Sequence, residues 1–164
     1  MIVRKETSQD VESIFNLTTE AFKPMSYSDG SEPKIINDLR NDGDLILSLV
    51  AVDHKEVIGH VAFSPITVNN IGDNWYGLGP ISVLPQRQRS GIGTRLINEG
   101  FRRLTELGAN GIALIGDPNY YGRFGFTGDG RLTYGDLPTN LVQWVSIKGD
   151  VPNGELKYCR AIEP

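Results

Sequence analysis

Two glycines and several arginines lie close together at residues 87–95, which read Arg-Gln-Arg-Ser-Gly-Ile-Gly-Thr-Arg. Gly91 and Gly93 have no Cβ, so the oxygens of an anion can approach the backbone there. If a helix begins at this point, its first turn supplies N–H groups without intrahelical partners and the positive end of the helix dipole. Positive side chains stand around the glycines, at Arg87, Arg89 and Arg95. This combination predicts an anion-binding site, and a diphosphate fits it.

A strand and a helix are expected on either side of this turn. Before it, Ile81 and Val83 alternate with a polar residue, as in a pleated strand, and Pro85 marks the end because it cannot donate a ladder hydrogen bond. After it, apolar residues recur at the spacing of one helical face as far as Gly108, a usual stop. These apolar positions are Ile92, Leu96, Ile97, Phe101, Leu104 and Leu107. The turn at residues 88–94 is therefore expected at the N-terminus of a helix.

Two familiar phosphate-binding loops do not match this turn. A P-loop requires a lysine directly after its last glycine, whereas Thr94 follows Gly93 here. A dinucleotide-binding fingerprint requires a third glycine where this chain has Leu96, and it belongs in the first strand-helix unit rather than past the middle of the chain. What remains is the pattern Gln-x-x-Gly-x-Gly, formed by Gln88, Gly91 and Gly93.

This six-residue pattern matches the coenzyme A pyrophosphate motif of the GCN5-related N-acetyltransferase (GNAT) superfamily. Residues 78–85, Leu-Gly-Pro-Ile-Ser-Val-Leu-Pro, resemble the fourth strand of that family. A second match lies downstream, where Tyr121 precedes Gly125 and Phe126 as in the family signature Tyr-x-x-x-Gly-Phe. Because the two motifs occur in the family's order and spacing, the sequence resembles an acetyltransferase of this superfamily.

The resemblance implies an α/β fold in which a mixed, mostly antiparallel central sheet is flanked by helices and the fourth and fifth strands splay apart. We expect residues 1–164 to form one such domain. Gly79 and Pro80 lie inside the predicted fourth strand. They cost a hydrogen bond and side-chain packing, and a strand tolerates them at an edge or a bulge. The splay that the resemblance implies explains why Gly79 and Pro80 are present inside this strand.

The resemblance also implies acetyl-CoA as cosubstrate. The pantetheine arm would pair with the free backbone around Ile81, Ser82 and Val83, between the splayed strands. The N–H groups of the turn would bind the diphosphate through Gln88, Arg89, Ser90, Gly91, Ile92, Gly93 and Thr94. Asn119 would contact the thiol end of the coenzyme, although it stands closer to the tyrosine of the signature than the corresponding asparagine usually does, and Phe124 would contact its outer side.

Transfer of an acetyl group from a thioester to an amine requires a proton for the departing thiolate. A tyrosine can supply that proton, because its reference pKa of about 10 is only a unit or two above that of an alkylthiol. By its position in the motif, Tyr121 is that tyrosine. Without the resemblance, Tyr120 and Tyr121 would be interpreted as packing aromatics near a helix end. With it, we predict that Tyr121 is the general acid.

The same reaction requires a base that takes a proton from the amine. Many relatives use a glutamate on the fourth strand or a water relayed by backbone carbonyls, but residues 75–84 include no acid, and Asp73 is the nearest. His60 is the leading alternative, because its pKa suits proton transfer and it lies on a strand near the sheet centre. The competing interpretation is that His60 is a packed or solvent-facing residue of that strand.

The acceptor amine is not identified by any motif, so small metabolite amines, antibiotics and peptide N-termini all stay open. In the resembled family a helix-loop-helix region near the N-terminus helps to build the acceptor pocket. This makes Tyr27, Asp29 and Glu32 candidates, although an exposed loop explains them equally well. Glu20 and Glu32 also stay open as bases. A non-catalytic acyl-CoA-binding sensor or regulator is the competing class of function, and relatives commonly form homodimers.

Hydrophobic periodicity predicts the remaining elements. Strands are expected at residues 1–5, 45–52, 57–68, 111–115, 141–147 and 156–162, helices at 7–22, 31–40 and 119–124, and a mobile loop at 127–136. The second and third of these strands should form a hairpin, and the last two should be joined by residues 148–154.

Composition excludes several other classes of protein. The chain has 164 residues, a formal charge of −4 and 39% hydrophobic residues, enough for one domain with a core. Its positive residues are scattered apart from the arginines near Gln88, which disfavours nucleic acid as a partner. No apolar run could cross a bilayer and the start does not resemble a signal peptide, so we predict a cytoplasmic protein. With Cys159 as the single cysteine, and with His54 and His60 the two histidines, we expect neither disulfide nor metal.

Overall fold

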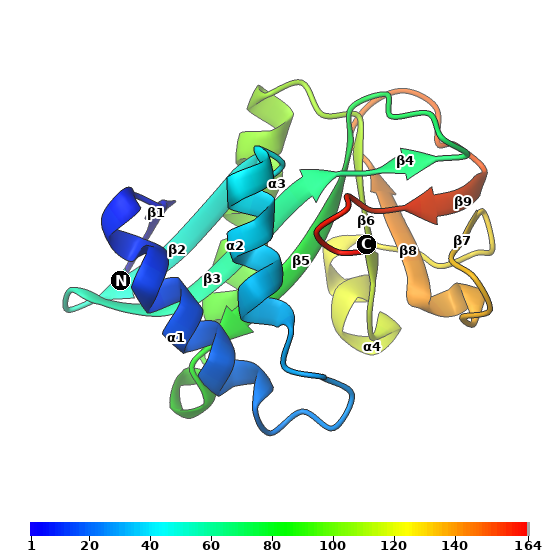
Figure 1. Cartoon of the computed structure of the whole chain (residues 1–164). Coiled ribbons are helices and arrows are strands. Elements are labelled where there is room, and N and C mark those ends of the chain that lie inside the picture. The colour runs from blue at the N-terminus through cyan, green and yellow to red at the C-terminus, as the bar shows by residue number, and fades with distance from the viewer. Residues whose placement is uncertain (164) are drawn as a thin grey trace.

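The computed structural model describes residues 1–163, which form a six-stranded sheet with helices on both faces and a smaller three-stranded sheet beside it (Figure 1). The strands of the main sheet are β1 (Ile2–Lys5), β2 (Leu47–Asp53), β3 (Glu56–Pro65), β5 (Trp75–Val83), β6 (Gly111–Ile115) and β8 (Val142–Ser146), and they lie in that order across the sheet. The β5–β6 pairing is parallel and the other pairings of this sheet are antiparallel. The predicted α/β fold with a mixed, mostly antiparallel sheet is therefore confirmed.

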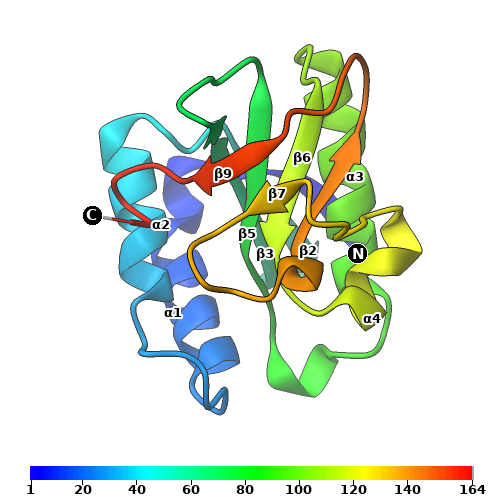
Figure 2. The same cartoon turned by 90° about the vertical axis from the view of Figure 1, so that its right-hand side faces the viewer.

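Helices α1 (Val11–Phe22) and α2 (Glu32–Asp42) cover one face of this sheet, and α3 (Ile92–Glu106) and the short α4 (Pro118–Tyr121) lie on the other (Figure 2). Successive side chains of a strand point to opposite faces. On the first face, Val50 of β2 packs with Ile14 of α1 and Ile36 of α2. On the second face, a Cβ added to Gly59 of β3 would lie 2.9 Å from Ile92, so α3 sits directly on the strand.

Strand β5 is paired with β3 along most of its length but with β6 only at its start. Its parallel pairs with β6 end at Gly77, which lies opposite Ala113. On the β3 side the register shifts between Val61 and Phe63, where Gly79 and Pro80 together face a single residue. The predicted bulge is therefore present, and beyond Gly77 the side of β5 that faces β6 has no ladder partner.

The smaller sheet consists of β4 (Thr67–Val68), β9 (Gly154–Lys157) and β7 (Leu132–Thr133), in that order. Three predictions are wrong here. The strand expected at 57–68 is divided between the two sheets, the loop expected at 127–136 contains β7, and the last strand starts at Gly154 and ends at Lys157 rather than spanning 156–162. β9 pairs with β4 and β7 rather than with β8. Strand partners so distant along the chain cannot be predicted from the local alternation of apolar and polar residues.

The start of the first helix follows its sequence signal. Thr7 and Asp10 form a capping box around a short 3-10 turn, Ser8–Asp10, and α1 continues from Val11. The buried face of α1 includes Leu17, whereas Phe15 is 40% exposed. Among residues 1–163, no helix combines the length and the apolar character needed to cross a membrane.

Candidate active site

Helix α3 begins inside the glycine turn. Gly91 has a φ of +87° with nothing within 4 Å of an added Cβ, so glycine is needed there for its backbone conformation rather than for space. The first helical bond from this residue is donated by the Arg95 N–H to the Gly91 carbonyl, at 3.1 Å. The amides of residues 92–94 therefore precede the internal hydrogen bonding of α3. Such N–H groups, together with the helix dipole, favour an anion.

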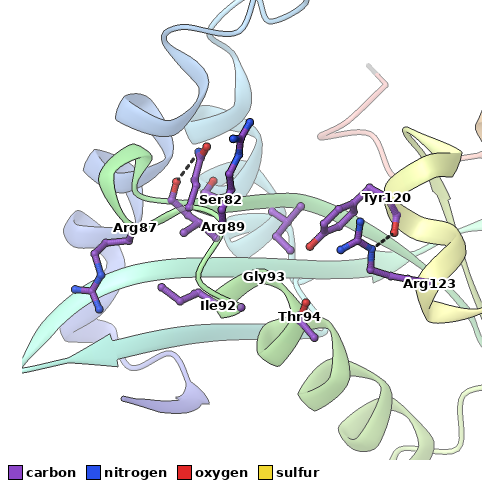
Figure 3. A pocket seen from close by; sticks show the side chains of 12 residues that line it. Ser82, Arg87, Arg89, Ile92, Gly93, Thr94, Tyr120 and Arg123 are labelled. Atoms are coloured by element: carbon purple, nitrogen blue, oxygen red, sulfur yellow. Dashed lines mark hydrogen bonds between the residues drawn. The ribbon is translucent and has the colours of Figure 1, made fainter.

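A cleft of about 640 Å³ opens beside this turn, between β5 and the segment that contains α4 (Figure 3). One wall is the part of β5 that has left β6, and the floor is the start of α3. The lining residues are Ile81, Ser82, Val83, Arg87, Gln88, Arg89, Gly91, Ile92, Gly93, Thr94, Tyr120 and Arg123. The cleft thus brings together nine of the predicted coenzyme-binding residues, which come from β5, from the turn that follows it and from the start of α3.

Three hydrogen bonds fix the shape of the turn. The Gln88 side-chain amide donates to the Val83 carbonyl at 3.2 Å and so ties the turn to the end of β5. The Ser90 hydroxyl donates to the Arg87 carbonyl at 2.5 Å, which turns Ser90 away from the cleft lining. The Arg87 guanidinium donates to Asp53 at 2.8 Å and, with burial opposing it, lowers the pKa of that carboxyl. Arg87 is thereby held at the cleft by a residue of β2.

Tyr120 and Arg123 form the opposite wall, and sequence reasoning did not assign them to the site. The Arg123 Nε donates to the Tyr120 carbonyl at 2.9 Å, and its guanidinium carbon lies 4.6 Å from the centre of the Tyr120 ring. A Cβ added to Gly93 would lie 2.8 Å from the Tyr120 hydroxyl oxygen. Gly93 is therefore required for the close approach of Tyr120 over the turn. The sequence signal for this wall was the pair of adjacent tyrosines, of which the motif selected only the second.

Tyr121 lies behind this wall, at the end of β6. A Cβ added to Gly116 would lie 2.6 Å from the Tyr121 ring, and the ring centres of Tyr121 and Tyr120 are 4.9 Å apart in an edge-to-face arrangement. Burial, with smaller contributions from Tyr120, Tyr27 and Asp117, raises the pKa of the Tyr121 phenol to about 12. Tyr121 is therefore protonated at neutral pH, and it lies near the loop between α1 and α2 that carries Tyr27.

The remaining predicted coenzyme residues do not line the cleft. Asn119 is exposed in α4, where its N–H donates to the Asp117 carboxylate at 2.9 Å. The Phe124 ring packs against Tyr120 at a centroid distance of 5.6 Å, so it supports the wall from behind. Both roles stay predictions. Within residues 1–163, no group of three or more His, Cys, Asp or Glu side chains is placed to hold a metal ion.

The acidic candidates of the acceptor loop take part in local structure. The Ser28 hydroxyl donates to Glu32 at 2.6 Å, and the Ser31 N–H donates to Asp29 at 3.0 Å. Both bonds shape the turn before α2. Tyr27 is different, because 77% of its side chain is exposed at the tip of this loop.

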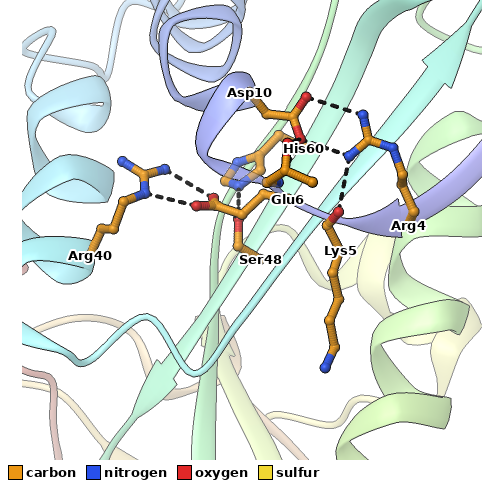
Figure 4. Close-up of polar contacts among 8 residues, drawn as sticks. Arg4, Lys5, Glu6, Asp10, Arg40, Ser48 and His60 are labelled. Atoms are coloured by element: carbon orange, nitrogen blue, oxygen red, sulfur yellow. Dashed lines mark hydrogen bonds and ion pairs between the residues drawn. The ribbon is translucent and has the colours of Figure 1, made fainter.

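His60 lies away from the cleft, in a buried polar cluster on the face covered by α1 and α2 (Figure 4). Its Nε2 is 2.8 Å from the Ser48 hydroxyl, which in turn donates to Glu6. Arg40 of α2 donates two hydrogen bonds to the same Glu6 carboxylate, at 2.8 and 2.9 Å. Since Glu6 can only accept hydrogen bonds, the Ser48 proton points at it, and His60 must donate from Nε2.

This arrangement does not favour His60 as the catalytic base. Its side chain is fully buried, and burial lowers its pKa to about 4, with Glu6 opposing and Arg40 adding to the effect. Its Nδ1 is buried without a hydrogen-bond partner in residues 1–163, and so is the Ser82 hydroxyl across the β3–β5 pair. The cluster joins the residue after β1 to β2, β3 and α2.

The fold and this cleft define an acyltransferase, and the chain belongs to the GNAT family. The model of the Acetyltransferase (GNAT) family matches residues 11–126, more than half of the chain. The match includes both motifs on which the family resemblance was based. The predictions of the family and of an acetyl-CoA-dependent N-acetyltransferase are therefore confirmed.

Individual relatives agree with this assignment. The chain is 38% identical over 127 residues to the uncharacterized N-acetyltransferase YhbS of Escherichia coli strain K12, covering 77% of this chain and 73% of that protein. The crystal structure of YhbS with CoA superimposes with a TM-score of 0.89 at 30% identity, over 99% of this chain and 92% of that one. A GNAT family acetyltransferase from Brucella melitensis, solved with acetyl-CoA, gives a TM-score of 0.89 at 41% identity, over 99% and 97% of the two chains.

Proposed function

We propose that this protein transfers the acetyl group of acetyl-CoA directly to an amine, with Tyr121 as the general acid. The diphosphate binds the N–H groups of the turn at residues 88–94, and the pantetheine arm lies along Ile81, Ser82 and Val83. The observation that carries the proposal is the cleft, because it joins an anion site to a strand edge whose backbone has no ladder partner. The Brucella and Escherichia relatives, solved with acetyl-CoA and CoA, support this choice of ligand.

The reaction requires that the departing thiolate gains one proton and that the amine nitrogen loses one. The amine nitrogen bonds to the thioester carbonyl carbon, the carbon–sulfur bond breaks, and the departing thiolate takes the Tyr121 proton. The nitrogen releases a proton, and Tyr121 regains one before the next turnover. Because burial raises the pKa of Tyr121 to about 12, this phenol keeps its proton at neutral pH until negative charge develops on the sulfur.

Binding of the coenzyme is tested by thermal unfolding with and without acetyl-CoA, using ATP as the anion control. Ligand at about a hundred times its Kd adds about 2.7 kcal/mol of stability, enough to raise the Tm by a few degrees. Gly93→Ala should reduce this shift, since its Cβ would lie 2.8 Å from the Tyr120 hydroxyl, and Tyr120→Phe in the same chain should restore part of it. An equal shift with ATP, or none with acetyl-CoA, would remove the basis of the proposal.

Catalysis is tested with Tyr121→Phe, which keeps the ring that packs on Gly116. We expect kcat to fall by about a hundredfold or more, the usual contribution of a general acid, while acetyl-CoA still raises the Tm. Tyr76→Phe is the matched control, since Tyr76 packs against the main core and does not line the cleft. Full turnover in Tyr121→Phe would show that another group protonates the thiolate. If the unmodified protein binds acetyl-CoA but no amine stimulates CoA release, the non-catalytic sensor is the better description.

A further inference from the structure

The α1–α2 face of β5 has no side chain at the point where the strand leaves β6. The last β5–β6 pair contains Gly77, and a Cβ added there would lie 2.7 Å from the ring of Tyr158. Tyr158 follows β9, far along the chain from β5. A tyrosine from the C-terminal segment thus occupies the space that a β5 side chain would take, at the last pair that β5 makes with β6.

Three contacts fix the C-terminal segment in this position. The Cys159 thiol donates to the Pro65 carbonyl at the end of β3, at 3.1 Å. Arg160 donates to both oxygens of Asp42 on α2, each at 2.6 Å. Figure 2 shows the segment crossing from β9 toward α2. The segment is therefore fastened to the same face of the sheet as the acceptor loop.

A carboxylate accompanies Tyr158 on this segment. The N–H of Glu163 donates to the Cys159 carbonyl at 3.0 Å, which turns the chain back. The Glu163 carboxylate accepts a hydrogen bond from the Tyr134 hydroxyl at 2.6 Å, and the ring centres of Tyr134 and Tyr158 are 5.7 Å apart, edge to face. Tyr134 thus links the acid to the ring that covers Gly77.

We propose that Tyr158 and Glu163 form the acceptor subsite of the proposed reaction, and that the acceptor is a primary amine recognised as its ammonium ion. The inference rests on the proposed acetyl transfer. Before the reaction the ammonium ion releases one proton to solvent, which frees the lone pair of the nitrogen for attack. The Tyr158 hydroxyl accepts a hydrogen bond from the amine and directs its nitrogen toward the side of β5 that has left β6. Glu163 acts through charge, because a carboxylate beside aromatic rings attracts an ammonium ion.

The electrostatic surroundings fit this subsite. Burial raises the pKa of the Tyr158 phenol well above its ordinary range, and Tyr134, Glu163 and Tyr121 raise it further. Tyr158 therefore stays a neutral hydroxyl and offers oxygen lone pairs, while Glu163 supplies the negative charge. Tyr121 lies close enough to Tyr158 to raise its pKa. Such closeness is needed if Tyr121 protonates the sulfur of the thioester while Tyr158 positions the attacking nitrogen.

The test compares two amines as acceptors: butylamine, which is charged at neutral pH, and trifluoroethylamine, which is largely uncharged there. Glu163→Gln should raise the KM for butylamine about tenfold or more, as expected when a hydrogen-bonded charge is removed, and leave the KM for trifluoroethylamine and for acetyl-CoA unchanged. Tyr158→Phe should weaken both amines about fivefold, since it removes one hydrogen bond and keeps the ring over Gly77. Tyr76→Phe, on the other face of β5, should change neither.

The outcomes separate this inference from the proposed function. If the unmodified protein acetylates amines and Glu163→Gln treats the two amines alike, the subsite is wrong and the acetyltransferase assignment stands. If neither amine, nor any other primary amine, stimulates CoA release, the proposed function fails and the subsite with it. A loss of Tm together with equal loss for every substrate would assign Tyr158 and Glu163 a purely structural role and overturn the inference.

Discussion

Acid should destabilise this protein mainly through His60. The buried imidazole is neutral with a pKa of about 4, whereas the same group in the unfolded chain titrates at 6.5. As the pH falls below 6.5, His60 becomes protonated in the unfolded chain but stays neutral in the folded protein, so the equilibrium moves toward unfolding. The sign is thus a loss of stability on acidification. It begins near pH 6.5 and is complete below the folded pKa.

The size of this loss follows from the two pKa values. A difference of one pKa unit is worth about 1.4 kcal/mol, so the full loss through His60 is about 3 kcal/mol, of which about 2 kcal/mol is gone by pH 5. The total free energy of unfolding of a typical domain is about 5–15 kcal/mol. The loss is therefore large enough to move a denaturant midpoint.

This loss of stability is measured by urea unfolding between pH 8 and pH 4.5, followed by tryptophan fluorescence. His60→Gln keeps a polar side chain near Ser48 but cannot gain a proton, so its free energy of unfolding should be nearly flat between pH 6.5 and 5. Glu6 and Asp10 also have lowered pKa values, and their contributions, lost only at more acid pH, are present in both proteins. Parallel loss of stability in the two proteins over this window would refute the burial argument, as would an NMR titration that places the His60 pKa near 6.5.

Two further substitutions test the ion pair of Arg87 beside the cleft and the packing at the start of the β5–β6 pair. Asp53→Asn should weaken acetyl-CoA binding by less than about fivefold, because it releases Arg87 from an exposed ion pair, and added salt should shrink the difference in Kd. Gly111→Ala should lower the stability by about 1–3 kcal/mol, because its Cβ would lie 2.3 Å from the ring of Trp75, while Gly72→Ala, which meets nothing within 4 Å, is the control for the same unfolding assay.

The coenzyme side of the site could be predicted because its signals are local. The strand, the turn and the helix that hold the anion site follow one another along the chain, and Gly91 and Gly93 lie inside one short pattern. β5 ends two residues before Pro85 and α3 ends two residues before Gly108, the two stop signals in the sequence. Even the bulge is visible in the sequence, since Gly79 and Pro80 are poor residues for a regular strand.

The acceptor side could not be predicted in the same way, because its parts come from distant segments. Tyr158 touches Gly77, and Tyr134 contacts Glu163, through contacts that no pattern of neighbouring residues encodes. The same reason explains the error about β9, whose partners β4 and β7 come from separate stretches of the chain. The surroundings of His60 could not be predicted for a related reason, since alternation places it on a strand but does not reveal that Glu6 and Arg40 lie close to it.

This difference between the two sides has a consequence for specificity. In the proposed site, a change in the turn at residues 88–94 would alter the binding of the acetyl donor, so it would affect the acetylation of every amine alike. A change at Tyr158 or Glu163 alters a segment that is fastened to the sheet at a few points and can vary without disturbing β5, because Gly77 offers no side chain that must be matched. In the proposed subsite the acceptor groups lie on the C-terminal segment and not on β5, which separates the choice of amine from the binding of the acetyl donor.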